Sequence, residues 1–217
     1  MSSEPPFTVV VTAGPTREYI DDVRYLSNAS SGRMGIAVAN AASAAGCRAH
    51  LLLGPVESPA VELVSPAVEL HRFVSALDLD RLARELWPQT DAFVATAAVA
   101  DYRPAERIPG KRKKDDGDWN LRLVRNPDVL AGRGAEKTRQ VLVGFALEAT
   151  FDSEAARRKL VQKQLDVIIL NTAANLASAG GDFEWLGAGG ECRRFHSVTK
   201  EELAHEIVEF VVARKQG

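Results

Sequence analysis

The feature that most constrains this chain is an alternation of short apolar runs with stretches of helical periodicity. Strands that alternate with helices build a mostly parallel sheet with helices on both faces. We therefore predict an α/β fold with a doubly wound, Rossmann-like sheet, whose ligands bind beyond the carboxyl ends of the strands. The expected strands are residues 7–11, 49–53, 68–74, 91–97, 140–145 and 166–170, and the expected helices are 31–46, 76–87, 128–136, 153–164 and 199–214.

Three stretches fall outside this alternation, at 13–32, 102–122 and 175–197. The polar excursion at about 102–122 is too long for an ordinary connection, and we expect a flap there. Residues from about 183 to 195 indicate a β-hairpin appended to the sheet. Because a hairpin is marginal alone, its exposed apolar side chains favour a homodimer. We treat residues 1–217 as a single domain. The apolar residues expected to be exposed on the hairpin are Phe183, Trp185, Leu186 and Phe195.

The composition excludes several classes of protein. The 217 residues are 46% hydrophobic and carry a net charge of −2, which suits a globular domain and lacks the basic excess of a nucleic-acid binder. The first apolar run is too short to span a membrane, and the polar N-terminus does not resemble a signal peptide. With only two cysteines and four scattered histidines, we expect a cytoplasmic protein without a disulfide framework or a zinc cage.

The loop after the first strand holds a candidate phosphate or carboxylate site. The dinucleotide fingerprint G-x-G-x-x-G is missing, because Gly14 stands alone and Gly32 follows far downstream. Backbone N–H groups at the start of the next predicted helix nevertheless suit an anion. Alternatively, Ser30 or Ser31 caps that helix and Gly35 only allows close packing. The candidate anion-binding residues are Gly14, Arg17, Ser30, Ser31, Gly32 and Gly35.

Arg24 and Asn28 belong to the same loop. Arginine offers a planar, permanently charged fork for a phosphate or a carboxylate. The amide of Asn28 can hold a carbonyl or phosphoryl oxygen without bringing charge. The alternative for Arg17 and Arg24 is that each is an ordinary solvated side chain.

Later loops and helices add further candidates. Asp101 follows the fourth strand, where it could accept from ribose hydroxyls, hold a metal or cap a turn. The run Lys111-Arg-Lys-Lys is either a solvated charge run or a basic flap that closes over a triphosphate. Asn126-Pro127 indicates a turn that opens a helix. Lys159 and Lys163 share one helix face, which is either an anion site or simply exposed.

In their order along the chain, these motifs resemble phosphopantothenoylcysteine synthetase, the ligase domain of the bacterial DNA/pantothenate metabolism flavoprotein family. The matches run from about residue 9 to residue 171. They are Thr12-Ala-Gly-Pro-Thr-Arg-Glu, Val23-Arg-Tyr-Leu-Ser-Asn-Ala-Ser-Ser-Gly-Arg-Met-Gly, Ala97-Ala-Val-Ala-Asp-Tyr, Lys111-Arg-Lys-Lys, Asn126-Pro-Asp-Val and Val143-Gly-Phe-Ala.

The resemblance implies a ligase of coenzyme A biosynthesis. CTP would activate 4′-phosphopantothenate as an acyl-cytidylate with release of pyrophosphate, and cysteine would then displace CMP. By matching position, Asn28 contacts the acyl intermediate, Arg24 supports its loop and Lys111 serves the phosphates, so these three are the expected catalytic residues. The expected nucleotide-binding residues are Ala97, Asp101, Lys111, Asn126, Pro127, Asp128, Val129, Phe145, Lys159 and Lys163.

The same resemblance implies a homodimer without nucleic-acid or membrane partners. A triphosphate normally needs Mg²⁺, and since no protein cage is visible, we expect the metal to arrive with the nucleotide. The flavin-dependent decarboxylase domain that often precedes this one is not in the sequence, so we expect no flavin and no decarboxylation.

Two points stay open at this level. The stretch Gly144-Phe-Ala-Leu-Glu-Ala-Thr150 is one residue longer than the family's Gly-Phe-Ala-Ala-Glu-Thr, which leaves the contacts of Glu148 undefined. The residues alone do not choose CTP over ATP; the resemblance does.

The alternative functions are an NAD(P)- or flavin-dependent oxidoreductase on a Rossmann fold and a non-catalytic nucleotide-binding module.

Overall fold

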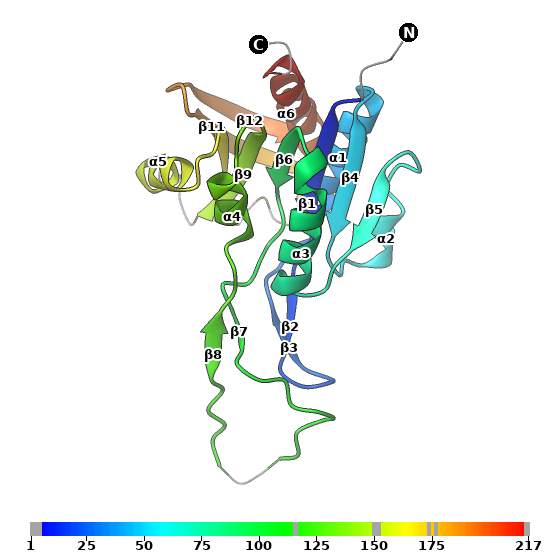
Figure 1. Cartoon of the computed structure of the whole chain (residues 1–217), viewed down its shortest axis with the longest axis vertical. Coiled ribbons are helices and arrows are strands. Elements are labelled where there is room, and N and C mark those ends of the chain that lie inside the picture. Colours follow the sequence, from blue (N-terminus) through cyan, green and yellow to red (C-terminus); the bar gives the residue numbers. More distant parts are fainter. Residues whose placement is uncertain (1–5, 115–116, 149–152, 173–174, 176–177, 215–217) are drawn as a thin grey trace.

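An eight-stranded sheet runs through the computed structural model of the chain (Figure 1). The structure describes residues 6–114, 117–148, 153–172, 175 and 178–214. The strands from β10 to β5 are parallel, whereas β11 pairs antiparallel with both β10 and β12. This confirms the predicted, mostly parallel α/β sheet. In spatial order the strands are β12 (Cys192–Thr199), β11 (Gly180–Gly187), β10 (Val167–Thr172), β9 (Val141–Glu148), β6 (Ala92–Ala95), β1 (Thr8–Ala13), β4 (Arg48–Leu53) and β5 (Glu69–Arg72).

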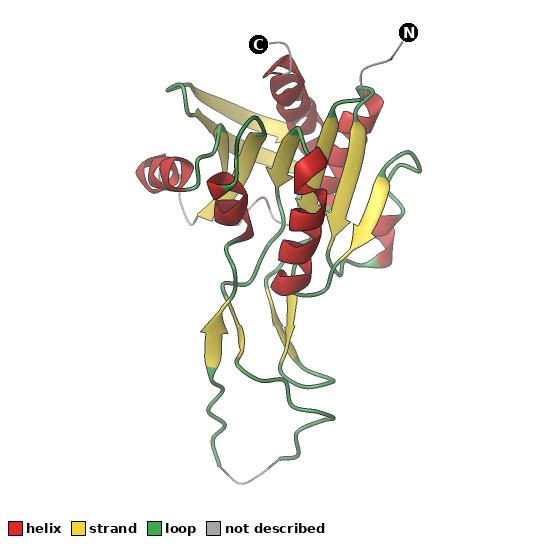
Figure 2. Cartoon of the chain, in the orientation of Figure 1, coloured by secondary structure: helices red, strands yellow, loops and turns green. Residues whose placement is uncertain are grey.

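Helices cover both faces of the sheet (Figure 2). One face carries α1 (Arg33–Ala44) and α6 (Lys200–Ala213), and the other carries α3 (Ala76–Leu86), α4 (Val129–Ala135) and α5 (Ser153–Gln162). The described residues also form two short helices, α2 (Ser58–Val61) and the 3₁₀ helix η1 (Trp87–Gln89). In the part of the chain that the structure describes, no helix combines the length and apolar character needed to cross a membrane.

Strand β1 explains why the sequence reads as a continuous apolar run. Successive side chains of a strand point to opposite faces. Val9 and Val11 therefore enter the core beneath α1 and α6, while Val10 enters the core beneath α3. Because both faces are covered, a central strand must be apolar at every position rather than at alternate ones.

Two antiparallel ribbons extend from the carboxyl-end side of the sheet (Figure 1). The first arm consists of β2 (Arg17–Tyr19) and β3 (Tyr25–Ser27), and the second of β7 (Tyr102–Pro104) and β8 (Leu123–Arg125). The sequence analysis predicts no strands here, because three-residue strands show no periodicity. The expected flap at about 102–122 forms β7 and the loop beyond it.

The apolar residues of the β11–β12 hairpin correct the sequence analysis. They were expected to be exposed, but Phe183, Trp185 and Leu186 are at most 3% exposed. Helix α6 covers the face that carries Phe183 and Trp185, where the rings of Trp185 and Phe210 meet edge to face with centroids 5.1 Å apart. Leu186 is buried on the opposite face, in the core that includes α5. The hairpin therefore completes the core of its own chain and gives no reason for a dimer.

Helix α1 begins differently from either serine-capped alternative. Its N-cap is Gly32, which has a φ of 73° and makes no side-chain cap. Ser30 Oγ accepts instead from the backbone N–H of Gly32, at 3.4 Å. A left-handed backbone at this position explains why a glycine stands there.

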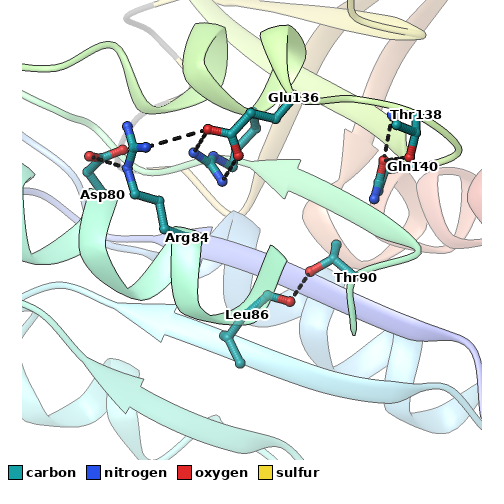
Figure 3. A network of polar contacts seen from close by, with 8 residues as sticks. Asp80, Arg84, Leu86, Thr90, Glu136, Thr138 and Gln140 are labelled. Atoms are coloured by element: carbon teal, nitrogen blue, oxygen red, sulfur yellow. Dashed lines mark hydrogen bonds and ion pairs between the residues drawn. The ribbon is translucent and has the colours of Figure 1, made fainter. Parts of the chain in front are cut away.

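A polar network joins α3 to α4 (Figure 3). The Arg84 guanidinium donates to Asp80 at 2.9 Å and pairs with Glu136 at 3.5 Å. The same Glu136 pairs at 2.9 Å with Arg133, which is fully buried and lies over the Trp87 ring. These contacts fix α4, whose first residues reach the carboxyl ends of the strands.

Gly35 provides a test of how α1 packs on β1. A Cβ at Gly35 would lie 2.5 Å from both Ala13 Cβ and Thr96 Oγ1. We expect Gly35→Ala to destabilise the domain by about 1–3 kcal/mol, the usual cost of overpacking. Gly132→Ala, in α4 with no atom within 4 Å of the new Cβ, is the matched control. It should be neutral or stabilise by up to about 1 kcal/mol. Equal urea midpoints for Gly35→Ala and wild type would contradict this packing role.

Candidate active site

The strand order places a crevice between β1 and β6. From β1 the chain adds β4 and β5 toward one edge of the sheet. From β6 it adds β9 and β10 toward the opposite edge. Loops that leave neighbouring strands in opposite directions open a crevice at the carboxyl ends, where this class of fold binds ligands. Two cavities lie there, with volumes of about 470 and 640 Å³.

The smaller cavity, called here the α4 cavity, reaches from the sheet to the start of α4. Its size is within the usual range for small-molecule sites. Apolar side chains such as Leu79 and Phe93 line part of it. It brings together most of the expected nucleotide-binding residues, namely Ala97, Asp101, Asn126, Pro127, Asp128, Val129, Phe145 and Lys163.

The larger cavity, called here the α1 cavity, reaches to the start of α1. It contains the expected residues Asn28, Ser30, Ser31, Gly32 and Lys159. The two cavities adjoin, since both are lined by Ala97, Val99, Asp101, Phe145 and Lys163. An extended ligand can therefore occupy both.

Asn28 ties the loop before α1 to the loop after β6. Its Nδ2 donates to the backbone oxygen of Val99 at 3.0 Å. An amide nitrogen carries two hydrogens. The second hydrogen is available for a ligand oxygen in the α1 cavity, so the residue can position its loop and act as a donor.

Asn126 and Asp128 build the wall of the α4 cavity. Asn126 Nδ2 donates to Ala100 O at 2.8 Å, which joins the loop after β6 to the loop before α4. Asp128 caps α4 by accepting from Ala131 N at 3.0 Å and also pairs with Lys163 Nζ at 2.7 Å. Lys163 is thereby held at the boundary between the cavities.

The α1 cavity also contains cations that the sequence analysis missed. Lys200 at the start of α6 is only 5% exposed, and its Nζ donates to Ser178 O at 2.6 Å. Burial, with help from the nearby charge of Arg33, lowers the pKa of Lys200. Lys200 is distant in sequence from every motif, so only the packing of α6 beside α1 reveals it. Asn171 and Asn175 line the same cavity.

The electrostatic character of the α1 cavity is positive. Arg33, Lys159, Lys163 and Lys200 line it, and Asp101 is the carboxylate among its described lining residues. Like charges gathered around a cavity destabilise it unless an anion is bound there. The arrangement therefore suits a ligand with phosphate or carboxylate groups.

Some expected anion-binding residues lie elsewhere. The lining of the α1 cavity does not include Gly14, Arg17 or Gly35. Gly35 packs against β1, as described above. Arg17 lies in the first arm with its guanidinium over the Tyr25 ring, 4.6 Å from the centroid. Gly14 has a φ of 79° in the turn after β1.

Arg24 and Lys111 also lie outside both cavities, in the arms. Arg24 Nε donates to Asp21 at 2.9 Å, and this hydrogen bond holds the pKa of the buried Asp21 carboxyl well below its usual value. Asp21 accepts from Arg112 N at 3.2 Å, and Asp22 accepts from Gly110 N at 2.8 Å. The turn of the first arm thus clamps both chain neighbours of Lys111.

The extra residue near Glu148 falls largely outside the described chain. The backbone of Glu148 ends β9, where it pairs with Thr172 of β10. Ala149 and Thr150 are not among the described residues. The altered contacts expected there stay a prediction.

Comparisons with known proteins identify the family. The DNA/pantothenate metabolism flavoprotein C-terminal domain family matches residues 7–214. The coenzyme A biosynthesis bifunctional protein CoaBC of Bacillus subtilis (strain 168) is 38% identical over 209 residues, which cover 94% of this chain and 51% of that protein. The chain thus spans about half the length of this curated relative.

Two solved structures share the fold. The crystal structure of the C-terminal domain of CoaBC superposes with a TM-score of 0.82 at 31% identity and covers 98% of both chains. A Cab2 mutant in complex with phosphopantothenate-cysteine superposes with a TM-score of 0.73 at 16% identity, covering 97% of this chain and 89% of its own. Motif order, strand order and these matches agree, and the chain belongs to the DNA/pantothenate metabolism flavoprotein C-terminal domain family.

Proposed function

We propose that this domain is a phosphopantothenate–cysteine ligase that uses CTP in coenzyme A biosynthesis. One observation carries the proposal: two adjoining cavities at the strand ends share a wall that includes Asp101, Phe145 and Lys163. A two-part intermediate, half nucleotide and half acyl group, needs two such compartments side by side. The names of the relatives and of the bound product in Cab2 support the choice of substrates.

In the first step, a carboxylate oxygen of 4′-phosphopantothenate attacks the α-phosphorus of CTP, and pyrophosphate leaves. The α4 cavity would hold the nucleotide, with Asp101 at the ribose and Lys163 at the α-phosphate. The cationic lining of the α1 cavity would hold the phosphate and carboxylate of the acyl substrate. Each charged group then faces an opposite charge, which lowers the cost of bringing two anions together.

In the second step, the cysteine amine attacks the acyl carbonyl, the C–O bond to CMP breaks, and the amine loses a proton. Negative charge builds on the carbonyl oxygen as the bond forms. Asn28 would donate the free hydrogen of its Nδ2 to that oxygen. Its other hydrogen is held by Val99 O at 3.0 Å, which fixes the direction of the amide.

Magnesium fits this site only when it comes with the nucleotide. The described carboxylates that line the two cavities are Asp101 and Asp128, and Asp128 is paired with Lys163 at 2.7 Å. Mg²⁺ in nucleotide sites is usually bound by one or two carboxylates together with phosphate oxygens. Bound there with the phosphates, the metal would neutralise charge on the leaving pyrophosphate, while Asp101 contacts the ribose.

Asn28→Asp tests the second step. The variant should still release about one equivalent of pyrophosphate from CTP, because the nucleotide contacts are unchanged. It should then stall with the acyl-cytidylate on the protein, since losing an oxyanion donor costs about 10²–10³ in rate. Quenched-flow mass spectrometry would detect the adduct. Turnover of cysteine near the wild-type rate would show that Asn28 only positions its loop.

Lys111→Gln tests the flap. Lys111 lies away from the cavities and its chain neighbours are bonded to the first arm, so it reaches the phosphates only when the two arms close together or when a second copy supplies it. A cation that acts mainly in the transition state lowers the rate more than the affinity when removed. We expect slower pyrophosphate release with nearly unchanged CTP binding, and Lys114→Gln, in the same run, as a silent control. If Lys111→Gln released pyrophosphate at the wild-type rate, as Lys114→Gln should, the run of cations would be only a solvated surface segment.

We also propose a homodimer, formed through the arms rather than through the hairpin. A two-stranded ribbon is marginally stable alone. The arms expose apolar side chains, with Val23 at 57%, Tyr102 at 46%, Leu123 at 43% and Tyr25 at 40% exposure. Pairing two copies would cover these groups near the mouth of the site.

Sedimentation velocity tests this assembly. The wild type should sediment as a dimer at micromolar concentration, and Val23→Asp should shift it to a monomer by placing a charge in the interface. Val161→Asp is the matched control, since Val161 is 72% exposed on α5, away from the arms. A monomeric wild type, or dissociation by both substitutions alike, would contradict the proposal.

A further inference from the structure

Two histidines and a glutamate meet at the β5 edge of the sheet, away from both cavities. Strands β4 and β5 pair in parallel, with His50 opposite Glu69 and Leu52 opposite His71. The three polar side chains therefore share the face that carries α3. The sequence analysis predicts no metal site, because residues about twenty positions apart show no ligand spacing until the strands pair.

The atoms of this cluster are close enough for one metal ion. His50 Nδ1 lies 3.1 Å from His71 Nε2 and 3.4 Å from Glu69 Oε2, and all three atoms lie within 4.8 Å of one another. Zinc bonds of about 2.0–2.2 Å place tetrahedral ligand atoms roughly 3.3–3.6 Å apart. The two separations from His50 Nδ1, 3.1 and 3.4 Å, are close to that spacing.

The surroundings hold the three groups in place. His50 is 1% exposed, so protein atoms rather than water surround its ring. Arg48 Nε donates to Glu69 Oε1 at 2.8 Å, and its Nη2 lies 3.3 Å from Oε2. The guanidinium thus orients the carboxylate beside the histidines, as an outer-shell partner does.

Two arrangements fit the contact between the imidazoles. His50 Nδ1 and His71 Nε2 either share one proton in a hydrogen bond or both bind one cation. His50 Nε2 is buried without a hydrogen-bond partner in the structure, and coordination at Nδ1 would leave it protonated as before. A cation is favoured by the convergence of His50 Nδ1, His71 Nε2 and Glu69 Oε2 on one point.

We propose that His50 Nδ1, Glu69 Oε2 and His71 Nε2 bind one divalent cation of the zinc class. The fourth position faces solvent, because the Glu69 side chain is 47% exposed. The ion fastens β5, a four-residue edge strand, to β4. It takes no part in the ligase reaction, since none of the three residues lines either cavity of the candidate active site.

Cobalt titration of untagged, chelator-treated protein tests the proposal. We expect one equivalent of Co²⁺ to give the visible absorption of a tetrahedral site and Zn²⁺ to displace it. His71→Ala and Glu69→Gln should each weaken binding by at least about tenfold, the smallest loss that even outer-shell partners cause. His205→Ala, on α6, is the matched control and should bind like the wild type.

Folding of each variant is checked by circular dichroism, and Glu69→Gln keeps the test valid if His71→Ala fails to fold. Zinc should also raise the melting temperature of the wild type but not of Glu69→Gln. Absence of stoichiometric binding to the wild type would overturn the proposal. So would binding that survives Glu69→Gln unchanged or that is lost in His205→Ala.

Discussion

The hydrogen bonds between the loops that leave β1 and β6 hold the candidate site together. Ala98 N donates to Gly14 O at 2.9 Å, and Thr16 N donates to Ala98 O at 3.3 Å. Thr16 Oγ1 in turn accepts from Ala100 N at 3.0 Å. These bonds continue the parallel pairing of β1 and β6 beyond the carboxyl ends of the two strands. The loop that carries Asn28 and the loop that carries Asp101 can then face each other across one crevice.

The packing of helices around this crevice also decides where positive charge gathers. The whole chain is almost neutral, yet the α1 cavity gathers cations from α1, α5 and α6. Lys200 is held there by a backbone carbonyl although burial lowers its pKa. A fold that concentrates positive charge in one cavity while staying neutral overall favours small anionic ligands over a polyanion.

The sequence predicts the layers well because buried parallel strands are apolar at every position. It places Ala97 and Asp101 at a strand end because they follow the apolar run of β6, whereas Phe145 lies inside β9 and its expected role comes from the family resemblance. It fails where tertiary packing decides. The hairpin aromatics are buried because α6 covers them, and Lys200 joins the site because α6 packs beside α1. Arg24, expected to support the Asn28 loop, and Lys111, expected to act from the flap, lie in the arms outside both cavities, and their catalytic roles stay predictions.

Pyrophosphate release in the absence of cysteine is the most direct test of a two-compartment ligase site. The domain would be mixed with CTP and Mg²⁺, with and without 4′-phosphopantothenate, and pyrophosphate measured against time. The proposed function predicts a burst of about one equivalent per site that requires 4′-phosphopantothenate and is abolished by chelator. Release that ignores 4′-phosphopantothenate, or that occurs with ATP but not with CTP, would contradict it.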